Sequence, residues 1–425
     1  MMINREIVKR ISRMVEDEED ATIKLIRDLI SFPSIPGKEK ECAEFCANKL
    51  REIGLQVDMW EPDIEELKRS PGFSPVEMNY KGRPNVVGIL KGEKGGRSLL
   101  FNGHTDVIPP GPLEFWRHHP WKGEIEDGKI YGRGACDMKG GIAAMIKAVE
   151  CVKNLGLSLK GDLIVECVVD EENGGNGTLA SILRGYRADA GIFCEGWGKN
   201  KIVIGHRGAT AYRITLTGQT APVGRRGEVV NIIAKMAKIC EALKSLETCR
   251  LASLSHPLYE RYLNYVPILI GKIQGGFWRC AVPLKCTIEG TIGLLPGEDL
   301  RKVQGSVRKY IQKVSEGDPW LKNNPPKVEF PSHYIEPCDI PCNHPLVQTL
   351  QRISKEATGE EPEILAVNCG ADQRLRILYG QTPSVQFGPG GGNSHGPDEY
   401  VLISEVLTCV TVLALTILEW CGYKR

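Results

Sequence analysis

Side chains that could bind a divalent metal follow the predicted strands of this 425-residue chain. Apolar runs at 97–103, 161–169, 190–194 and 383–394 each lead into an imidazole or a carboxylate, and one further acid stands at the start of the predicted helix 138–156. These side chains are His104, Asp137, Asp170, Glu171, Glu172, Glu195 and His395. Because ligands of open α/β sheets bind at the carboxyl ends of the strands, we expect these groups to converge on one crevice.

The three adjacent acids at 170–172 are costly to desolvate and repel one another, which raises the question of what cation, if any, makes them tolerable. Imidazole and carboxylate ligands suit zinc or another divalent metal of intermediate softness. These seven side chains stand at five positions along the chain, because Asp170, Glu171 and Glu172 are adjacent. One ligand from each position, one of them able to bridge, would suit two ions roughly 3.5–4 Å apart better than one tetrahedral zinc. Such a site polarises a carbonyl and activates water, and a spare carboxylate then serves as general base. Each motif taken singly also fits an ordinary loop, so the prediction depends on their joint occurrence.

The elements that must position these groups are those of an α/β domain. Short apolar strands at 84–90, 97–103, 161–169 and 190–196 alternate with helical segments such as 138–156. This alternation predicts a largely parallel sheet flanked by helices.

The pattern changes near residue 208. Strands, helices and turns then follow in the order β-α-β-β-α-β up to about residue 336, which is the order of a split βαβ or ferredoxin-like unit. After it the α/β pattern resumes. We therefore expect a discontinuous metal-binding catalytic domain, residues 1–207 and 337–425, with an inserted domain at 208–336.

The bulk composition offers no reason to expect a nucleic-acid or membrane partner, because 54 basic and 53 acidic residues give a net charge of +1. The charged stretch 1–20 lacks the apolar core of a signal peptide, and the apolar run 401–425 predicts a buried final helix. Fifteen cysteines without a CxxC pair fit reduced thiols in a cytoplasmic protein. Cys338 and Cys342 could pair or bind metal, although two unrelated loop thiols are the favoured interpretation.

Four stretches resemble the signatures of one enzyme family. They are NGHTDVIP, GRGACDMKGG, DEENGGNGT and FGPGGGNSHGPDEYV. The chain is similar over nearly its whole length to the family of acetylornithine deacetylase, succinyl-diaminopimelate desuccinylase, aminoacylase and bacterial glutamate carboxypeptidase. The stretches WEPDIEELKRSPGF and LRGYRADA further resemble the formyl-aminopyrimidine deformylase branch.

This resemblance implies a role for each residue. His104 and Glu195 would bind one zinc, Glu172 and His395 would bind the other, and Asp137 would bridge both. Glu171 would be the general base, and Asp106 would hold the His104 ring. The metal ions would be zinc, with cobalt or manganese as alternatives. The inserted domain would be a lid that also mediates homodimerisation, and the substrate would be a small amide.

Three positions depart from the family pattern. Pro222 stands where many members have a lid histidine that stabilises the oxyanion, and proline has no donor to replace it. Cys280 and Gly293 stand where amino-acid-specific members often carry an asparagine and an arginine. Candidate substrate-binding residues are His206, Arg226, Arg374 and Gly390, with Arg207 and Arg225 as further replacements for the missing donor. Hinge and surface charges, and for Arg374 a structural salt bridge, are the alternatives.

Three functions fit the sequence. The leading one is a two-metal amidohydrolase that removes an acetyl, succinyl or formyl group. The second is a zinc exopeptidase or dipeptidase with the same chemistry. The third is a weakened homologue that only binds a small amide; Pro222 favours it, whereas the presence of Glu171 beside the complete ligand set opposes it.

Overall fold

The computed structural model describes residues 4–331 and 334–424, which form two compact units. Unit 1 contains the described residues up to Gly205, together with Asp339–Leu365 and those from Ala371 onward. Unit 2 contains the described residues of His206–Cys338 together with Ala366–Gly370.

The segment Ala366–Gly370 and the boundary residues His206, Arg207, Pro337 and Cys338 were expected in the first domain, but the structure assigns them to unit 2. Tyr262 Oη donates to the carbonyl oxygen of Ala366 at 2.8 Å, and Arg207 Nε donates to the carbonyl oxygen of Asn368 at 2.7 Å. These contacts join residues more than a hundred positions apart, so the local pattern could not indicate them.

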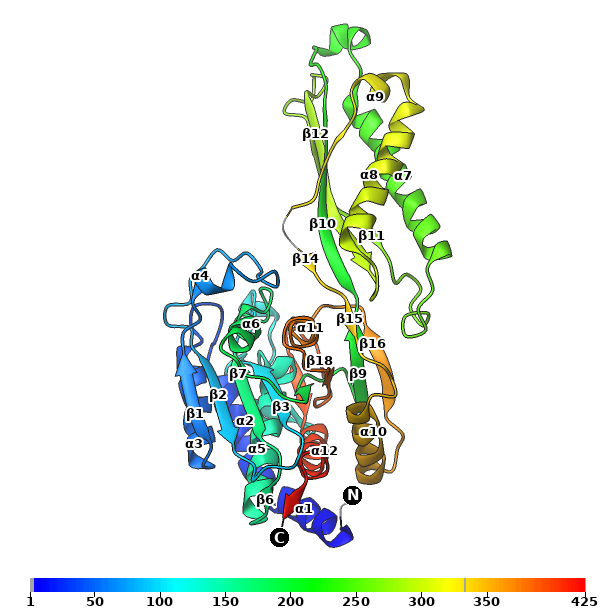
Figure 1. Cartoon of the computed structure of the whole chain (residues 1–425). Helices are drawn as coiled ribbons and strands as arrows, with labels where there is room; N and C mark the ends of the chain where they lie inside the picture. Colours follow the sequence, from blue (N-terminus) through cyan, green and yellow to red (C-terminus); the bar gives the residue numbers. More distant parts are fainter. Residues whose placement is uncertain (1–3, 332–333, 425) are drawn as a thin grey trace. The chain divides into compact units, whose positions relative to one another are not determined.

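A nine-stranded sheet forms the centre of unit 1 (Figure 1). Its order is β1 (Gln56–Trp60), β2 (Asn85–Leu90), β7 (Leu163–Val168), β3 (Leu99–His104), β8 (Ala190–Phe193), β17 (Ser384–Gln386), β9 (Lys201–His206) and β15 (Cys338–Asp339), with β16 (Glu363–Val367) also paired to β9. The predicted α/β class is confirmed, but the sheet is mixed. Strands β7, β3, β8 and β17 are parallel, whereas β1 is antiparallel to β2, β2 is antiparallel to β7, and β9 is antiparallel to β17.

The helices of unit 1 follow the amphipathic segments of the sequence. They are α1 (Arg5–Asp17), α2 (Glu19–Ser31), α3 (Lys40–Glu52), α4 (Ile64–Leu67), α5 (Gly140–Asn154), α6 (Asn176–Leu183), α10 (Pro345–Thr358), α11 (Gln373–Leu378) and α12 (Ile403–Cys421). Among the described residues, α12 alone is long and apolar enough to cross a membrane. It packs against α5 and α10, and most of its residues are buried, as expected for a core helix.

Two smaller sheets complete unit 1. The first has the order β18 (Gly391–Gly392), β19 (Tyr400–Leu402), β5 (Lys129–Tyr131) and β4 (Glu124–Glu126), and the second pairs β20 (Tyr423–Lys424) with β6 (Ser158–Leu159). The turn between β18 and β19 carries His395. Short helical turns lie at η1 (Leu113–Phe115) and η2 (Ala135–Lys139), and η2 leads directly into α5.

Unit 2 has the predicted β-α-β-β-α-β order. Its elements are β10 (Gly208–Thr217), η3 (Val223–Glu228), α7 (Ile232–Ser253), β11 (Ile268–Gly275), β12 (Lys285–Leu294), α8 (Leu300–Glu316), α9 (Pro319–Asn323), β13 (Lys327–Glu329) and β14 (Tyr334–Ile335). The strand order is β11-β12-β10-β13, with antiparallel pairing, and β14 also pairs with β10. Alternate residues of β10 pack against α7 and α8, which gives this unit a core of its own.

The cysteines form no disulfide within the described residues, and Cys338 is buried whereas Cys342 is exposed. This difference agrees with the interpretation of two unrelated thiols.

Candidate metal centre

The carboxylate of Asp137 lies between two imidazole rings. His104, the last residue of β3, places Nε2 at 3.0 Å from Asp137 Oδ1. His395, in the β18–β19 turn, places Nε2 at 3.2 Å from Asp137 Oδ2. Each carboxylate oxygen therefore faces a different ring, which is the arrangement of a ligand that can bridge two ions.

Glu172 completes a three-residue candidate metal site with Asp137 and His395. Its Oε2 atom lies 3.1 Å from His395 Nε2, and one ligand atom from each of the three residues lies within 4.8 Å of the others. Ser394 Oγ donates to Asp137 Oδ2 at 2.8 Å, so the same turn that carries His395 also orients this carboxylate.

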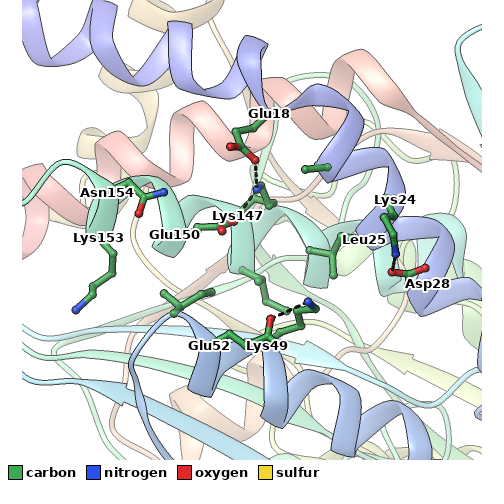
Figure 2. Close-up of a pocket in the computed structure, with 13 residues that line it drawn as sticks. Glu18, Lys24, Leu25, Asp28, Lys49, Glu52, Lys147, Glu150, Lys153 and Asn154 are labelled. Atoms are coloured by element: carbon green, nitrogen blue, oxygen red, sulfur yellow. Dashed lines mark hydrogen bonds and ion pairs between the residues drawn. The ribbon is translucent and has the colours of Figure 1, made fainter.

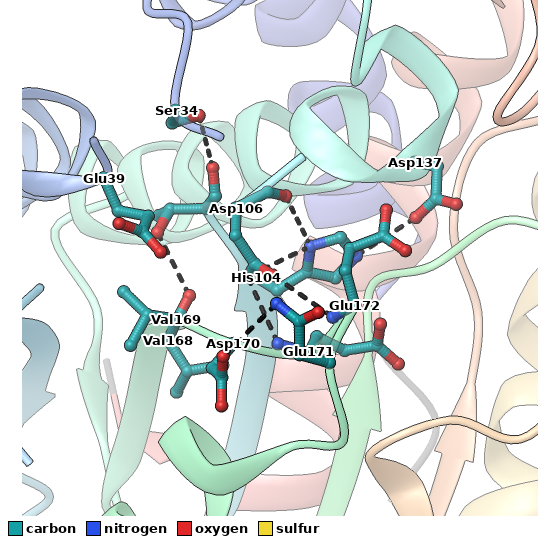
Figure 3. Close-up of polar contacts among 12 residues, drawn as sticks. Ser34, Glu39, His104, Asp106, Asp137, Val168, Val169, Asp170, Glu171 and Glu172 are labelled. Atoms are coloured by element: carbon teal, nitrogen blue, oxygen red, sulfur yellow. Dashed lines mark hydrogen bonds and ion pairs between the residues drawn. The ribbon is translucent and has the colours of Figure 1, made fainter. Parts of the chain in front are cut away.

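Asp106 contacts His104 and also the backbone of Glu171 and Glu172, whereas only the contact with His104 was expected. The His104 ring atom Nδ1 hydrogen-bonds to the backbone carbonyl of Asp106 at 2.9 Å, whereas the carboxylate lies farther from it, at 3.6 Å (Figure 3). The carboxylate instead accepts the backbone N–H groups of Glu171 and Glu172, at 3.3 and 3.2 Å. Asp106 thus fixes the imidazole through its main chain and the glutamate pair through its side chain.

Glu195, which follows β8, and Glu171, which follows β7, are the remaining predicted site residues. Burial raises the pKa of Glu195 to about 8, and the charge of Asp137 adds to this rise. Burial also raises the pKa of Glu171, and the charges of Asp372 and Glu195 act in the same direction. The charges of Glu172 and Glu195 act on Glu171, and those of Asp137 and Glu172 act on Glu195, so these carboxylates lie near one another.

The electrostatics of the site fit a bound cation. Hydrogen bonds to Asp137 and Glu172 raise the pKa of His395 to about 10. Burial opposes the protonation of His104, but the hydrogen bond to Asp137 and the neighbouring acids raise its pKa overall. Burial opposes the ionisation of Asp137, but the hydrogen bonds from His104 and His395 lower its pKa overall. The raised pKa values of Glu171, Glu195, His104 and His395 indicate an excess of negative charge around them, which divalent ions would neutralise. The donor set, imidazole nitrogen and carboxylate oxygen, also suits zinc and similar metals.

Glu399 and Arg133 support the two loops that carry Asp137 and His395, and the metal-ligand pattern did not reveal them. Glu399 is buried and accepts the backbone N–H groups of Gly134, Cys136 and Asp137, each at 3.0 Å. It also pairs with Arg133 Nη1 at 2.6 Å, while Arg133 Nη2 donates to the carbonyl oxygen of His395 at 3.3 Å. In the sequence, the only indication of this role is that Arg133 lies in the GRGACD stretch and Glu399 lies in the GPDEYV stretch.

The candidate substrate residues have varied environments. Arg374 is buried and donates to the carbonyl oxygens of Gly174 and Ala371, at 2.8 and 3.1 Å, which favours the structural alternative over a substrate anchor. His206 is buried, with Nδ1 at 3.0 Å from the carbonyl oxygen of Arg207. Gly390 is also buried, and Arg226 is exposed on η3 of unit 2.

Two of the departures from the family pattern lie side by side in unit 2. Pro222 bridges to Ala281, and the N–H group of Val223 donates to the carbonyl oxygen of Cys280 at 2.9 Å. The segments that carry Pro222 and Cys280 pair with each other, so these two departures change one local surface.

A separate pocket of about 430 Å³ lies among α2, α3 and α5 (Figure 2). Its charged side chains pair with one another; Lys147, for example, contacts Glu18 at 3.0 Å and Glu150 at 2.6 Å. None of the candidate ligands is among its described lining residues, so it is not part of the metal centre.

The chain is similar to several known proteins along nearly its whole length. An N-formyl-4-amino-5-aminomethyl-2-methylpyrimidine deformylase from Bacillus subtilis (strain 168) is 29% identical and covers 98% of each chain. A succinyl-diaminopimelate desuccinylase from Methylorubrum populi is 33% identical over 91% of this chain and 95% of its own. The solved dipeptidase Dug1p from Saccharomyces cerevisiae has the same fold, with a TM-score of 0.73, 17% identity and coverage of 98% and 99% of the two chains.

The model of peptidase family M20/M25/M40 matches residues 100–419, a span that includes every candidate metal ligand. The chain therefore belongs to peptidase family M20/M25/M40.

Proposed function

We propose that this protein is a two-metal amidohydrolase that removes a formyl or another small acyl group from an amine. The observation that carries the proposal is the position of Asp137, whose two carboxylate oxygens face His104 and His395 from opposite sides at 3.0 and 3.2 Å. A carboxylate so placed, with Glu172 beside one of the rings, suits a pair of ions better than a single one.

In this proposal each ion has ligands of its own. His104 and Glu195 hold one ion, Glu172 and His395 hold the other, and Asp137 is shared. Zinc is the expected metal, with cobalt and manganese as alternatives, because all ligands are imidazole nitrogens or carboxylate oxygens.

Bound ions would supply Lewis acidity, which polarises the amide carbonyl and makes a water molecule more acidic. Glu171 then takes a proton from the attacking water and gives it to the leaving amine. Burial raises the pKa of Glu171, so its carboxylate takes up a proton more readily than an exposed glutamate does. Asp106 holds the backbone of Glu171 and Glu172, so the base and one ligand keep a fixed relative position.

The substrate class is inferred from the relatives. One is named as a deformylase of an aminopyrimidine and matches along nearly the whole chain, and the other is named as a desuccinylase. Both names describe the removal of an acyl group from nitrogen. A formyl or short acyl amide is therefore the proposed substrate, ahead of a dipeptide.

A second candidate is a binding homologue with little activity. The surface that Pro222 and Cys280 share in unit 2 favours it, because proline offers no donor for an oxyanion. The loss of one such donor typically lowers the rate by roughly 10²–10³. Substituting Pro222→His would then raise activity, whereas the amidohydrolase proposal expects that another donor has already replaced this group.

We also propose that unit 2 acts as a lid and mediates a homodimer. Strand β11 is an edge strand, and its side chains Leu269 and Ile273 are each 57% exposed. An apolar edge strand is a natural surface for pairing with a second copy. The absence of a disulfide within the described residues supports a reducing, cytoplasmic location.

The test is a hydrolysis screen with purified protein loaded with Zn²⁺ or Co²⁺. The panel contains a formyl-aminopyrimidine, N-acetyl and N-succinyl amino acids and dipeptides, and the Glu171→Gln variant serves as the blank. Metal-dependent hydrolysis of an acyl amide that the variant lacks would support the proposal. Two bound ions with hydrolysis of dipeptides alone, or of nothing in the panel, would contradict it.

A further inference from the structure

Asp170 has a backbone conformation that side chains rarely adopt. Its φ is +69°, in the left-handed region, and it stands immediately before Glu171 and Glu172. Such a residue persists only when its surroundings determine its conformation. The contacts of Asp170 therefore decide where the following two glutamates point.

Both carboxylate oxygens of Asp170 are held by a segment distant in sequence. Tyr80 Oη donates to Oδ2 at 2.6 Å, and Arg83 Nη2 donates to Oδ1 at 3.0 Å. All three side chains are at most 2% exposed, and the Arg83 guanidinium lies 5.1 Å from the centre of the Tyr80 ring. Glu39 Oε1 accepts from Arg83 Nε at 2.8 Å and also lies 2.6 Å from Arg83 Nη2.

The same segment covers the rest of the loop. Ser74 Oγ donates to the carbonyl oxygen of Gly174 at 3.0 Å, and the Ser74 N–H group donates to Asn176 Oδ1 at 3.0 Å. Tyr80 packs with Val169 and other apolar side chains at the end of β7 and on α6. Residues 73–83, which begin at the end of the WEPDIEELKRSPGF stretch, thus form one wall against the loop 169–176.

We propose that Tyr80 and Arg83 are positioning residues for Glu171 and Glu172, and that they act through the carboxylate of Asp170. Asp106 holds the backbone of the glutamate pair, while Tyr80 and Arg83 hold the residue that precedes the pair. Without Tyr80 and Arg83, the Asp170 carboxylate keeps, among the described residues, only the longer side-chain hydrogen bonds from Asn173 and Asn176, at 3.5 and 3.4 Å, so its left-handed conformation loses its shortest contacts. The inference rests on the proposed function for the roles of Glu171 and Glu172.

The variant Tyr80→Phe tests the inference, because it removes one hydrogen bond and keeps the ring that packs with Val169. Metal affinity is measured by titrating metal-free protein with Zn²⁺ in competition with a chromophoric chelator. We expect one of the two ions to bind about tenfold more weakly, at the lower end of the effect usual for groups that orient ligands. We also expect kcat to fall about tenfold while KM changes less than twofold. Arg83→Lys removes the Nε donor to Glu39 and replaces the planar guanidinium with a single ammonium group, and it is expected to have similar effects.

The chain offers a matched control in a second Tyr–Asp–Arg cluster. Tyr186 Oη donates to Asp58 Oδ2 at 2.6 Å, and Arg184 Nε donates to the same oxygen at 2.7 Å. This cluster has the same chemistry but contacts no candidate ligand among the described residues. Tyr186→Phe should therefore leave metal affinity and kcat within twofold of the wild type.

A double variant tests whether Tyr80 acts through Asp170. In an Asp170→Asn background, Tyr80→Phe should lower metal affinity less than twofold further. Any of three results would overturn the inference. Tyr80→Phe could bind Zn²⁺ as tightly as the wild type, or it could lose no more metal affinity than Tyr186→Phe. The third such result is a double variant in which the losses of metal affinity from Tyr80→Phe and Asp170→Asn are fully additive. If the wild-type protein binds two ions but hydrolyses no amide, the proposed function fails, while the chelator titration still decides the positioning role.

Discussion

Replacing Glu399 with glutamine should loosen the loop that carries Asp137. Glu399 is 1% exposed; its Oε2 atom accepts from Arg133 and Gly134, and its Oε1 atom accepts from Cys136 and Asp137. A glutamine has one acceptor oxygen, so its NH₂ group would face two donors whichever way the amide turns. The substitution therefore removes two hydrogen bonds and leaves a buried guanidinium without its counter-charge.

The size of this effect follows from the buried ion pair. Breaking such a pair by removing one partner costs about 3–5 kcal/mol. At about 1.36 kcal/mol per factor of ten, a loss of about 3 kcal/mol makes opening of the loop roughly 150-fold more frequent. Hydrogen–deuterium exchange of the amides of Gly134, Cys136 and Asp137, measured on metal-free protein, reports this opening directly.

An exposed glutamate provides the control. Glu93 pairs with Lys424 at 2.8 Å and is 48% exposed, so Glu93→Gln should leave the exchange of these three amides unchanged. The Glu399→Gln variant should also bind Zn²⁺ more weakly, because Asp137 is no longer fixed. Wild-type exchange at Gly134–Asp137 in Glu399→Gln would refute the assignment of Glu399 as the support of this loop.

Three further predictions concern the metal centre and the lid. Glu171→Gln should keep two bound ions but lower kcat by roughly 10²–10⁴, the usual contribution of a general base; loss of the ions, determined by elemental analysis, would instead make Glu171 a ligand. The stability of the metal-free protein should fall as the pH rises from 5 to 9. The folded state keeps protons on Glu195 up to a pKa of about 8 and on His395 up to about 10, above their ordinary values of 4.5 and 6.5, so it binds more protons than the unfolded state throughout this window. Thermal unfolding with a chelator should show this slope and unfolding with Zn²⁺ should show much less of it; equal slopes would contradict the electrostatic interpretation. Ile273→Lys should convert a β11-mediated dimer into monomers in sedimentation analysis, and an unchanged dimer would exclude this strand as the interface.

The sequence by itself determined the classes of chemistry and their order along the chain. The candidates His104, Glu172 and Glu195 were recognisable because each follows a strand of the central sheet, and the carboxyl ends of neighbouring parallel strands meet. Asp137 was recognisable before the helix α5. His395 does not follow a central strand as predicted, because β17 ends at Gln386 and His395 lies in the β18–β19 turn of a smaller sheet. The β-α-β-β-α-β order of unit 2 was equally readable, since alternation along β10 and the helical spacing of α7 and α8 are local properties.

Only the tertiary structure shows which atoms of these residues make the contacts and which other residues hold them in place. The sequence suggested Asp106 as a partner of His104, but only the structure shows that its carbonyl holds the ring while its carboxylate holds the glutamate pair. The sequence allowed Arg374 to be a substrate anchor, but in the structure its guanidinium donates to the backbone carbonyl oxygens of Gly174 and Ala371.

The residues that support Asp137 and Asp170 lie far from them in the sequence. Glu399 is 262 residues from Asp137, and Tyr80 is 90 residues from Asp170. Periodicity and spacing report only on neighbours within a helix or strand. The partner of a buried charge, in contrast, is selected by packing, because a desolvated group must find a counter-charge or hydrogen bond wherever the fold brings one.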